Sequence, residues 1–249
     1  MELTEMMTQL RLKGFIQAYE LQRKMPEVDE LSFDERLRIL LEQESLYRED
    51  RQLSLLLKKA KLRYPGAWIE DIRYRNGRNI TKQMMLELGK NDWVRKHRNI
   101  IITGASGVGK TYIACALGNS ACRNGIKSLY VRLPRLLQEL KVARADGSYV
   151  KLLTQLSKVN VLIVDDWGLD TLNDHERKDF LEVMEDRYSA RSTIIATQVP
   201  VDKWHDIIGD HTIADAICDR LVHNAEHLQL TGDSLRKEKE QGSVNMKNE

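Results

Sequence analysis

Eight residues between two apolar stretches constrain the fold more than any other part of this 249-residue chain. Residues 104–111 read Gly-Ala-Ser-Gly-Val-Gly-Lys-Thr and fit the pattern G-x-x-x-x-G-K-[ST]. The apolar run 99–103 before them is of strand type, and residues 112–121 after them have the small and apolar spacing of a packed helix. Glycines in this context let the backbone turn tightly and aim N–H groups at phosphate oxygens, to which the helix dipole adds. The pattern therefore predicts a phosphate-binding loop, and a chance Gly-rich turn is the weaker alternative.

The chain beyond this loop alternates apolar runs with helical stretches, which is typical of a parallel α/β sheet. With the run before the loop, five strands are predicted, at 99–103, 127–131, 159–165, 192–197 and 226–230. Further helices are predicted at 134–143, 148–157, 173–188 and, with interruptions, 207–223. We therefore expect an α/β fold built on a P-loop nucleotide-binding core.

Two adjacent acids, Asp165 and Asp166, follow four apolar residues at the end of the third predicted strand. This is a Walker B pattern, in which the strand end sets Asp165 beside the loop, where it can hold Mg²⁺ through water. Asp166 would then polarise the attacking water, Lys110 would reach the β- and γ-phosphates, and Thr111 would offer its hydroxyl to Mg²⁺. An acidic turn that merely ends the strand is the competing interpretation, but paired acids are costly there without a cation.

Four further residues are candidates for the same chemistry. Thr197 and Gln198 end the fourth predicted strand, where either could orient a water molecule or simply begin an exposed loop. Arg220 lies on a predicted helix. It could form a surface ion pair, or it could be an arginine finger that reaches a neighbour's γ-phosphate. Arg236 is a second candidate for sensing phosphate.

Other conspicuous residues have weaker functional interpretations. Arg187 and Arg191 stand on either side of Tyr188 and could face a neighbouring subunit. His223 and His227 are four residues apart, but no third ligand accompanies them, so we expect structural roles rather than a metal site.

The N-terminal part is predicted to be helical, with a break at Pro26 and a capping box at residues 32–35 that starts the next helix. No Pro or Gly falls between Ser32 and Tyr64, so one long helix or two short-linked ones are both possible. Residues 67–75 resemble a short strand anchored by Trp68 and Ile72. The predicted organisation is a helical assembly domain at 1–65, a basic linker at 66–98, an ATPase core at 99–236 and a polar tail at 237–249.

Charge is distributed unevenly along the chain. Residues 58–98 carry 12 Lys/Arg against 4 Asp/Glu, interleaved with Tyr and Trp, and residues 131–151 carry a net charge of +3. Such basic segments are typical of contacts with nucleic-acid phosphates, although a solvated protein face is the competing interpretation of each. The sequence does not decide between the two segments.

From the remaining composition we expect a cytoplasmic protein. No apolar run approaches the roughly 20 residues of a membrane span, and the N-terminus lacks the layout of a signal peptide. The three cysteines show no metal-type spacing and are expected to be reduced.

Several stretches together resemble the IstB-like helper ATPases of bacterial insertion sequences, in the AAA+ clade of initiators and helicase loaders that includes DnaA and DnaC. The stretches in the core are 104–111, 161–168, 192–204 and 214–223; those in the N-terminal part are 10–14 and 31–37. The resemblance implies an AAA+ core with sheet order 5-1-4-3-2, and ATP-dependent self-assembly on duplex target DNA that stimulates a partner transposase.

Roles follow from this resemblance residue by residue. Lys110 and Thr111 bind nucleotide and Mg²⁺, Asp165 with Thr111 holds the metal, and Asp165 and Asp166 serve hydrolysis. Thr197 or Gln198 fills the first sensor position, Arg220 the finger and, loosely, Arg236 the second sensor. The 29 residues that follow Arg220 are too few for a full helical lid domain. The expected nucleotide contacts are Gly104, Ala105, Ser106, Gly107, Val108, Gly109, Lys110, Thr111, Tyr112 and Arg236.

Two other functions compete with a regulator of transposition. A replicative helicase loader would use the same ATPase core, although no cysteine precedes Cys115 to build a zinc module of the kind that some loaders carry. A small-molecule kinase fits less well, because it needs an acceptor pocket and an arginine-rich lid.

Overall fold

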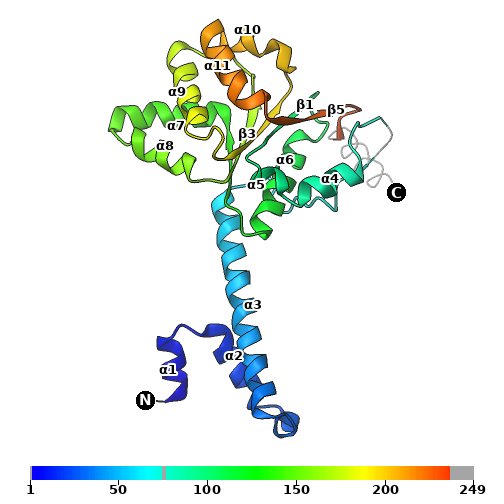
Figure 1. The fold of residues 1–249 in the computed structure, drawn as a ribbon, viewed down its shortest axis with the longest axis vertical. Coiled ribbons are helices and arrows are strands. Elements are labelled where there is room, and N and C mark those ends of the chain that lie inside the picture. Colours follow the sequence, from blue (N-terminus) through cyan, green and yellow to red (C-terminus); the bar gives the residue numbers. More distant parts are fainter. Residues whose placement is uncertain (1, 75–76, 236–249) are drawn as a thin grey trace, which may run out of the picture. The chain divides into compact units, whose positions relative to one another are not determined.

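The computed structural model describes residues 2–74 and 77–235, and the chain divides between Leu55 and Leu56 into two compact units. The N-terminal unit holds α1 (Leu3–Gln9), α2 (Lys13–Gln22), the 3₁₀ turn η1 (Pro26–Glu30) and most of α3 (Phe33–Ala60) (Figure 1). The predicted segment boundaries at 65, 98 and 236 stay predictions, and the predicted tail lies outside the described residues.

The helix α3 is continuous over 28 residues, because neither Pro nor Gly interrupts it. It begins with the predicted capping box: the Ser32 hydroxyl accepts the Glu35 N–H at 3.3 Å, and the Glu35 carboxylate accepts the Ser32 N–H at 2.8 Å. Of the two possibilities left open by the sequence, one long helix is therefore the correct one.

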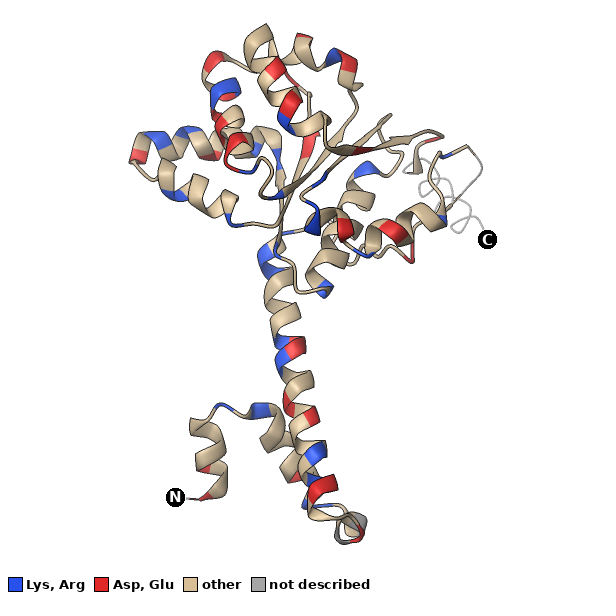
Figure 2. Cartoon of the chain, viewed as in Figure 1, with Lys and Arg blue, Asp and Glu red and all other residues tan. Residues whose placement is uncertain are grey.

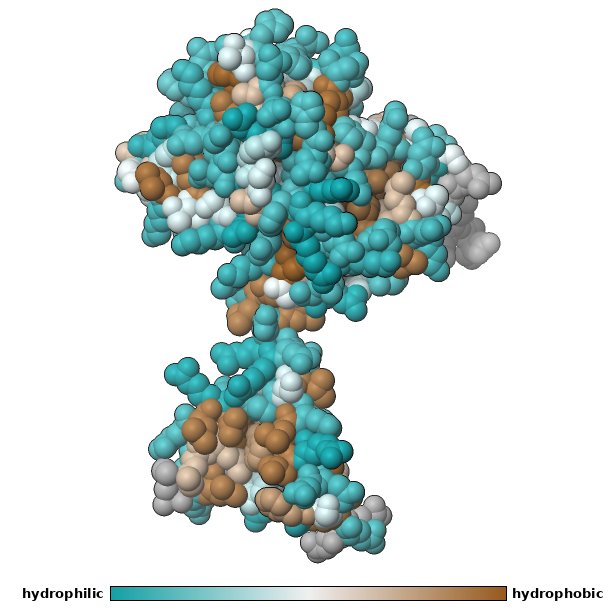
Figure 3. All heavy atoms as spheres, in the orientation of Figure 1, coloured by the Kyte–Doolittle hydropathy of each residue, from teal (hydrophilic) through white to brown (hydrophobic). Residues whose placement is uncertain are grey.

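Within the N-terminal unit, α2 lies close against α3. A Cβ atom on Gly14 would stand 2.6 Å from the Gln43 carbonyl oxygen, so only glycine permits this approach. The Glu44 carboxylate accepts the Phe15 N–H at 3.0 Å and so satisfies one of the free amides in the first turn of α2. Many large apolar side chains of this unit nevertheless stay exposed (Figure 3): Leu3, Met6, Leu10, Leu21, Met25, Leu31, Phe33, Ile39, Leu41, Leu46 and Leu55.

The C-terminal unit is built on a parallel five-stranded sheet of order β2-β3-β4-β1-β5, which confirms the predicted order 5-1-4-3-2. The strands are β1 (Asn99–Gly104), β2 (Ser128–Arg132), β3 (Val161–Trp167), β4 (Ser192–Thr197) and β5 (Ala225–Leu230). The apolar centres of β1, β3 and β4 are completely buried, as expected for parallel strands covered on both faces.

Helices cover both faces of this sheet (Figure 1). On one face, Leu162, Val164 and Ile195 share an apolar core with five helices that follow β2 in the chain. These are α7 (Leu133–Asp146), α8 (Tyr149–Ser157), α9 (Asp174–Glu185), α10 (Trp204–Ile208) and α11 (His211–Val222). The 3₁₀ turn η2 (Val201–Lys203) precedes α10. The other face is covered by α6 (Lys110–Arg123), where a Cβ on Gly118 would stand 2.6 Å from Ile163 Cδ1. Before the sheet come α4 (Lys82–Gly89) and α5 (Asp92–Arg95).

The predicted strand at 67–75 is wrong over the described residues 67–74, which form turns. The Ile72 N–H donates to the Ile69 carbonyl and the Ala67 N–H to that of Tyr64, so the backbone bonds locally instead of joining the sheet. Ile69 and Ile72 are buried as anchors three residues apart, which is the spacing of a turn rather than of a strand. Trp68 is 40% exposed, and the Arg123 guanidinium lies 4.3 Å from the centre of its ring. The prediction that Trp68 is a buried anchor is therefore wrong.

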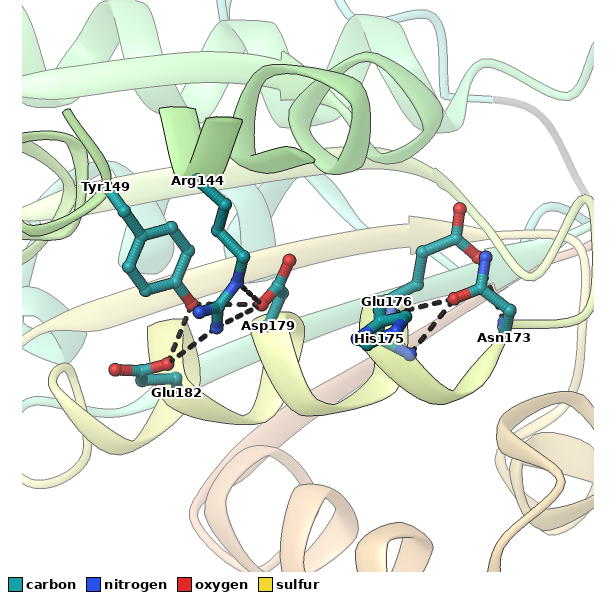
Figure 4. Close-up of polar contacts among 7 residues, drawn as sticks. All are labelled: Arg144, Tyr149, Asn173, His175, Glu176, Asp179 and Glu182. Atoms are coloured by element: carbon teal, nitrogen blue, oxygen red, sulfur yellow. Dashed lines mark hydrogen bonds and ion pairs between the residues drawn. The ribbon is translucent and has the colours of Figure 1, made fainter. Parts of the chain in front are cut away.

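A polar network joins the insertion α7–α8 to α9 (Figure 4). Arg144 at the end of α7 lies 2.6 Å from the buried carboxylate of Asp179, and the Tyr149 hydroxyl donates to Glu182 at 2.7 Å. Burial and these two carboxylates raise the pKa of Tyr149. At the start of α9, Asn173 completes a capping box with Glu176. Arg144, a basic residue of one of the two segments considered for contact with DNA, is thus engaged within the fold.

None of the described helices is both long enough and apolar enough to cross a membrane. Cys115 and Cys122 are free and buried, and Cys218 is free and half-buried.

Candidate nucleotide-binding site

The glycine-rich loop lies between β1 and α6, in the strand–loop–helix context that the sequence predicts. Gly104, Gly107 and Gly109 have φ angles of 148°, 83° and 100°, which L side chains rarely adopt. At Gly107 space is also lacking, because a Cβ there would collide with the side chain of Ser234. The loop therefore keeps its shape only with glycine at these positions.

Two distant segments hold this loop from outside. The buried Arg78 donates from Nη2 to the Val108 carbonyl at 2.6 Å and from Nη1 to the Arg73 carbonyl at 2.5 Å. From the segment after β5, the Leu235 N–H donates to the Gly107 carbonyl at 3.0 Å. Sequence reasoning missed Arg78, because nothing local indicates its contact with the loop. In the segment after β5 it assigned Arg236 to the nucleotide but not Leu235 to the loop.

The Lys110 ammonium lies inside the loop, at the first residue of α6. It donates to the carbonyl oxygens of Gly104 at 2.9 Å and Ala105 at 2.7 Å. A cation held at the curved loop beside free amides at a helix start is the arrangement that attracts an oligophosphate.

Asp165 lies at the carboxyl end of β3 and is almost completely buried. Its Oδ2 atom accepts hydrogen bonds from the Thr111 hydroxyl at 2.9 Å and the Tyr130 hydroxyl at 2.8 Å. Nη1 of Arg63 lies 3.9 Å from the same oxygen. Burial and the bond to Asp165 raise the pKa of Tyr130, so this hydroxyl stays protonated as a donor.

Asp166 turns away from the strand path into the same region. Its φ angle is 62°, and the pairing of β3 with β4 shifts register between Val164 and Trp167. Arg132, at the end of β2, donates from Nε to the Asp166 carboxylate at 2.5 Å, which raises the pKa of Arg132. From sequence, Arg132 was counted in the basic segment 131–151. In the structure β2 pairs with β3 so that Arg132 stands opposite Asp165, and that register indicates contact with the acids.

These side chains line one cavity of about 840 Å³ at the carboxyl ends of the strands. Predicted residues in its wall are Ser106, Gly107, Gly109, Lys110, Thr111, Tyr112, Asp165, Asp166, Thr197 and Gln198. Residues that the sequence did not assign to the site are Arg63, Tyr64, Asp71, Ile72, Arg73, Arg78, Ile113, Arg132, Ala196 and Leu235. A cavity of this size with several cations and two acids can hold a phosphorylated ligand together with a metal ion.

The two residues at the end of β4 differ in what their side chains contact. The buried Thr197 hydroxyl donates to the Trp167 carbonyl at 2.7 Å and accepts the Val199 N–H at 2.9 Å. Gln198 is exposed and lines the cavity. The Thr197 hydroxyl is therefore engaged in holding β3 to β4, whereas Gln198 presents a side chain to the cavity.

Arg220 lies at the opposite end of the sheet, where β1 begins. Its carbonyl accepts the Asn99 side-chain amide at 2.9 Å, and its guanidinium bonds the Glu185 carboxylate and lies 5.8 Å from the Tyr188 ring centre. The structure therefore does not bring Arg220 to the cavity of its own chain. The other arginine candidate, Arg236, lies outside the described residues.

Arg187 is only 2% exposed and does not face outward, contrary to the expectation from the sequence. Its guanidinium donates to the carbonyl oxygens of Leu156, Val159 and Ser192 and to the Thr193 hydroxyl. Arg187 thus ties the start of β4 to the turn after α8.

Among the histidines, His205 pairs with Asp215 at 2.9 Å.

Comparison with protein families matches residues 5–243 to the IstB-like ATP binding protein family. The insertion-sequence ATP-binding protein y4pL of Sinorhizobium fredii is 48% identical over 226 residues, which are 91% of this chain and 92% of that protein.

Among solved structures, the DnaC helicase loader is similar with a TM-score of 0.55 and 23% identity, over 68% of this chain and 99% of that one. Domain III of the replication initiation protein DnaA from Thermotoga maritima is similar with a TM-score of 0.57 and 18% identity, over 74% of this chain and 75% of that one. At this identity the likeness shows the fold, which is the AAA+ fold.

Proposed function

Because the chain belongs to the family of IstB-like ATP binding proteins, we propose that it is an ATPase that regulates transposition of an insertion sequence. The observation that carries the proposal is the convergence of Lys110, Thr111, Asp165 and Asp166 on one cavity. These residues come from α6 and β3 and would supply the phosphate-binding and hydrolytic groups of a P-loop ATPase.

Mg²⁺ is the metal that the donor set fits. The Thr111 hydroxyl and the Asp165 carboxylate stand 2.9 Å apart, and both are hard oxygen ligands. Mg²⁺ commonly takes one or two protein oxygens and completes its shell with water and phosphate oxygens. A bound ion would neutralise phosphate charge. Lys110 would contact the β- and γ-phosphates, and Asp166 would accept a hydrogen bond from the attacking water.

For orienting that water, Gln198 is the better of the two predicted candidates. The Thr197 hydroxyl already makes two hydrogen bonds within the chain, while Gln198 is exposed at the cavity wall. Its amide can donate to a phosphate oxygen and accept from water at the same time.

Arg220 serves a neighbouring copy in this proposal. It lies at the amino end of the sheet, away from its own cavity, so a finger role requires a second subunit whose cavity faces it. The N-terminal segment 1–65 is proposed as an assembly domain, which the exposed apolar side chains of its first 55 residues support.

Duplex DNA and a transposase are the proposed partners. The name of the relative from Sinorhizobium fredii supports the insertion-sequence context. Arg132, Arg135 and Arg144 of one basic segment pair with acids, and so do Arg63, Lys90 and Arg95 of the other. Of the two, 58–98 is the stronger candidate for DNA, because it has more exposed cations beside its paired ones. Exposed cations continue from the end of α3 onward (Figure 2): Lys58, Lys59, Lys61, Lys82, Lys96 and Arg98.

Nucleotide binding and hydrolysis test the proposal. The wild-type chain should bind ATP, and Lys110→Ala should lose that binding, while Lys151→Ala, an exposed lysine on α8, should bind normally. Filter binding should then show ATP-stimulated affinity for duplex DNA that falls steeply with salt. Unaltered ATP binding by Lys110→Ala would contradict the assignment of the cavity. In pull-downs, capture of a hexameric helicase instead of a transposase would favour a helicase loader, the alternative that the DnaC-like fold keeps open.

A further inference from the structure

We propose that Arg63 is a positioning residue that pairs with Asp165 and competes with Mg²⁺ for this carboxylate, an inference that rests on the proposed nucleotide site. Arg63 belongs to the segment that follows α3, outside the P-loop and the strand ends. Metal loading would therefore release a guanidinium held by a segment that sequence reasoning assigned to the N-terminal domain.

The backbone around Arg63 is fixed to the core. Leu62 is buried and lies against α6, since its Cδ2 atom is 3.1 Å from where a Cβ on Gly118 would stand. Two residues later, the Pro65 carbonyl accepts the side-chain amide of Asn119, also on α6, at 2.8 Å. Arg63 is thus anchored from both sides to the helix that starts at the phosphate-binding loop, and its side chain lines the cavity.

The contacts of Asp165 explain why a cation is needed there. Its side chain is 3% exposed, and the two hydroxyls that donate to Oδ2, from Thr111 and Tyr130, carry no charge. A buried carboxylate is costly unless positive charge offsets it. The Arg63 guanidinium, 3.9 Å from Oδ2, supplies such a charge.

Mg²⁺ at Thr111 and Asp165 would bring two positive charges to the oxygen that Arg63 approaches. Like charges at this distance repel, so the guanidinium has to give way. It can do so at little cost, because its side chain is 41% exposed and the adjacent cavity has room for it beside a phosphate. Removing Arg63 should therefore make Mg²⁺ binding easier rather than harder.

A titration of Mg²⁺ against the complex with a fluorescent ADP analogue measures this competition. The Mg²⁺ concentration at half-saturation should fall about two- to fivefold in Arg63→Gln, the range expected for a partly exposed ion pair. Arg63→Lys keeps the charge and should titrate within about twofold of the wild type. Lys59→Gln, which removes an exposed cation at the end of α3, is the matched control and should not shift.

A double variant tests whether the effect acts through Asp165. In an Asp165→Asn background, Arg63→Gln should cause no further change in the Mg²⁺ titration, because the carboxylate for which the cations compete is gone. An unchanged or higher Mg²⁺ requirement in Arg63→Gln would overturn the inference, as would an equal shift in Lys59→Gln. A wild-type chain that binds no nucleotide would instead overturn the proposed function, so the two failures are distinguishable.

Discussion

The two ends of the sheet in the C-terminal unit hold their arginines in different ways. At the carboxyl end, Arg63 and Arg132 face the acids of a cavity of about 840 Å³, and both are partly exposed. At the amino end, Arg187 and Arg220 line a space of only about 10 Å³ and bond mainly to backbone carbonyls and Glu185. The first end is built to receive a ligand, whereas the second is a packed surface that presents one arginine. Under the proposed function, the carboxyl end acts on the nucleotide of its own chain, whereas Arg220 at the amino end acts on that of a neighbour.

The largest expected effect tests the division of labour between the two ends. Arg220→Ala should bind ATP normally but lose about a thousandfold or more in hydrolysis by the assembled protein, as removal of an arginine finger does elsewhere. Mixing it with Asp166→Ala should restore phosphate release, because each subunit supplies the group that the other lacks. Arg135→Ala, an exposed arginine on α7 paired with Glu139, is the matched control. A mixture as inactive as its components would contradict a finger that acts in the site of a neighbouring subunit.

The fold was predictable from sequence because its signals are local. Glycines at 104, 107 and 109 demand a loop, apolar runs give the five strands, and the acids fall at a strand end. The cavity wall was predictable where it comes from the glycine loop, the first turn of α6 and the strand ends. Arg63 and Arg78 reach the site from segments whose place depends on tertiary packing, and neither spacing nor composition indicates it. Leu235 was missed as well, although the adjacent Arg236 was assigned to the nucleotide.

The residues that carry the family resemblance teach a related lesson. Trp167 and Trp204 come from two of the matching stretches, and their ring centres lie 5.0 Å apart in the core, with Phe180 4.8 Å from Trp167. They fix β3 and β4 relative to the helices that cover them, and so hold Asp166 and Gln198 at one edge. A motif recognised for function can thus owe its pattern to packing.

The second prediction concerns the buried arginine of the amino end. Arg187→Met should lower the free energy of unfolding by about 3 kcal/mol, since it leaves several buried carbonyl oxygens without a donor. Arg191→Met should cost less than about 1 kcal/mol, because Arg191 is half-buried and its carbonyl partners are partly or fully exposed. Denaturant titration measures both. Equal losses would mean that the amino end is not organised around Arg187.

The third prediction separates the two candidates at the end of β4. Gln198→Ala should slow hydrolysis about tenfold with stability unchanged within about 0.5 kcal/mol, since the side chain is exposed. Thr197→Val should instead cost about 1–2 kcal/mol of stability, because it leaves the Val199 N–H and the Trp167 carbonyl unpaired. Measuring both quantities for both variants assigns the roles, and the reverse pattern would make Thr197 the residue that orients the water.

The smallest effect is expected at the ion pair between Arg132 and Asp166. The two side chains are 53% and 21% exposed, so the pair is worth about 1 kcal/mol or less to stability. Asp166 must leave this pair before it can accept a hydrogen bond from water, so Arg132→Gln should raise hydrolysis without DNA by up to about fivefold. Arg135→Gln, at an exposed arginine in the first turn of the following helix α7, serves as the control. If Arg132→Gln lowers this rate tenfold instead, Arg132 contacts the phosphates and the carboxyl end uses its arginines for binding rather than for holding the acids.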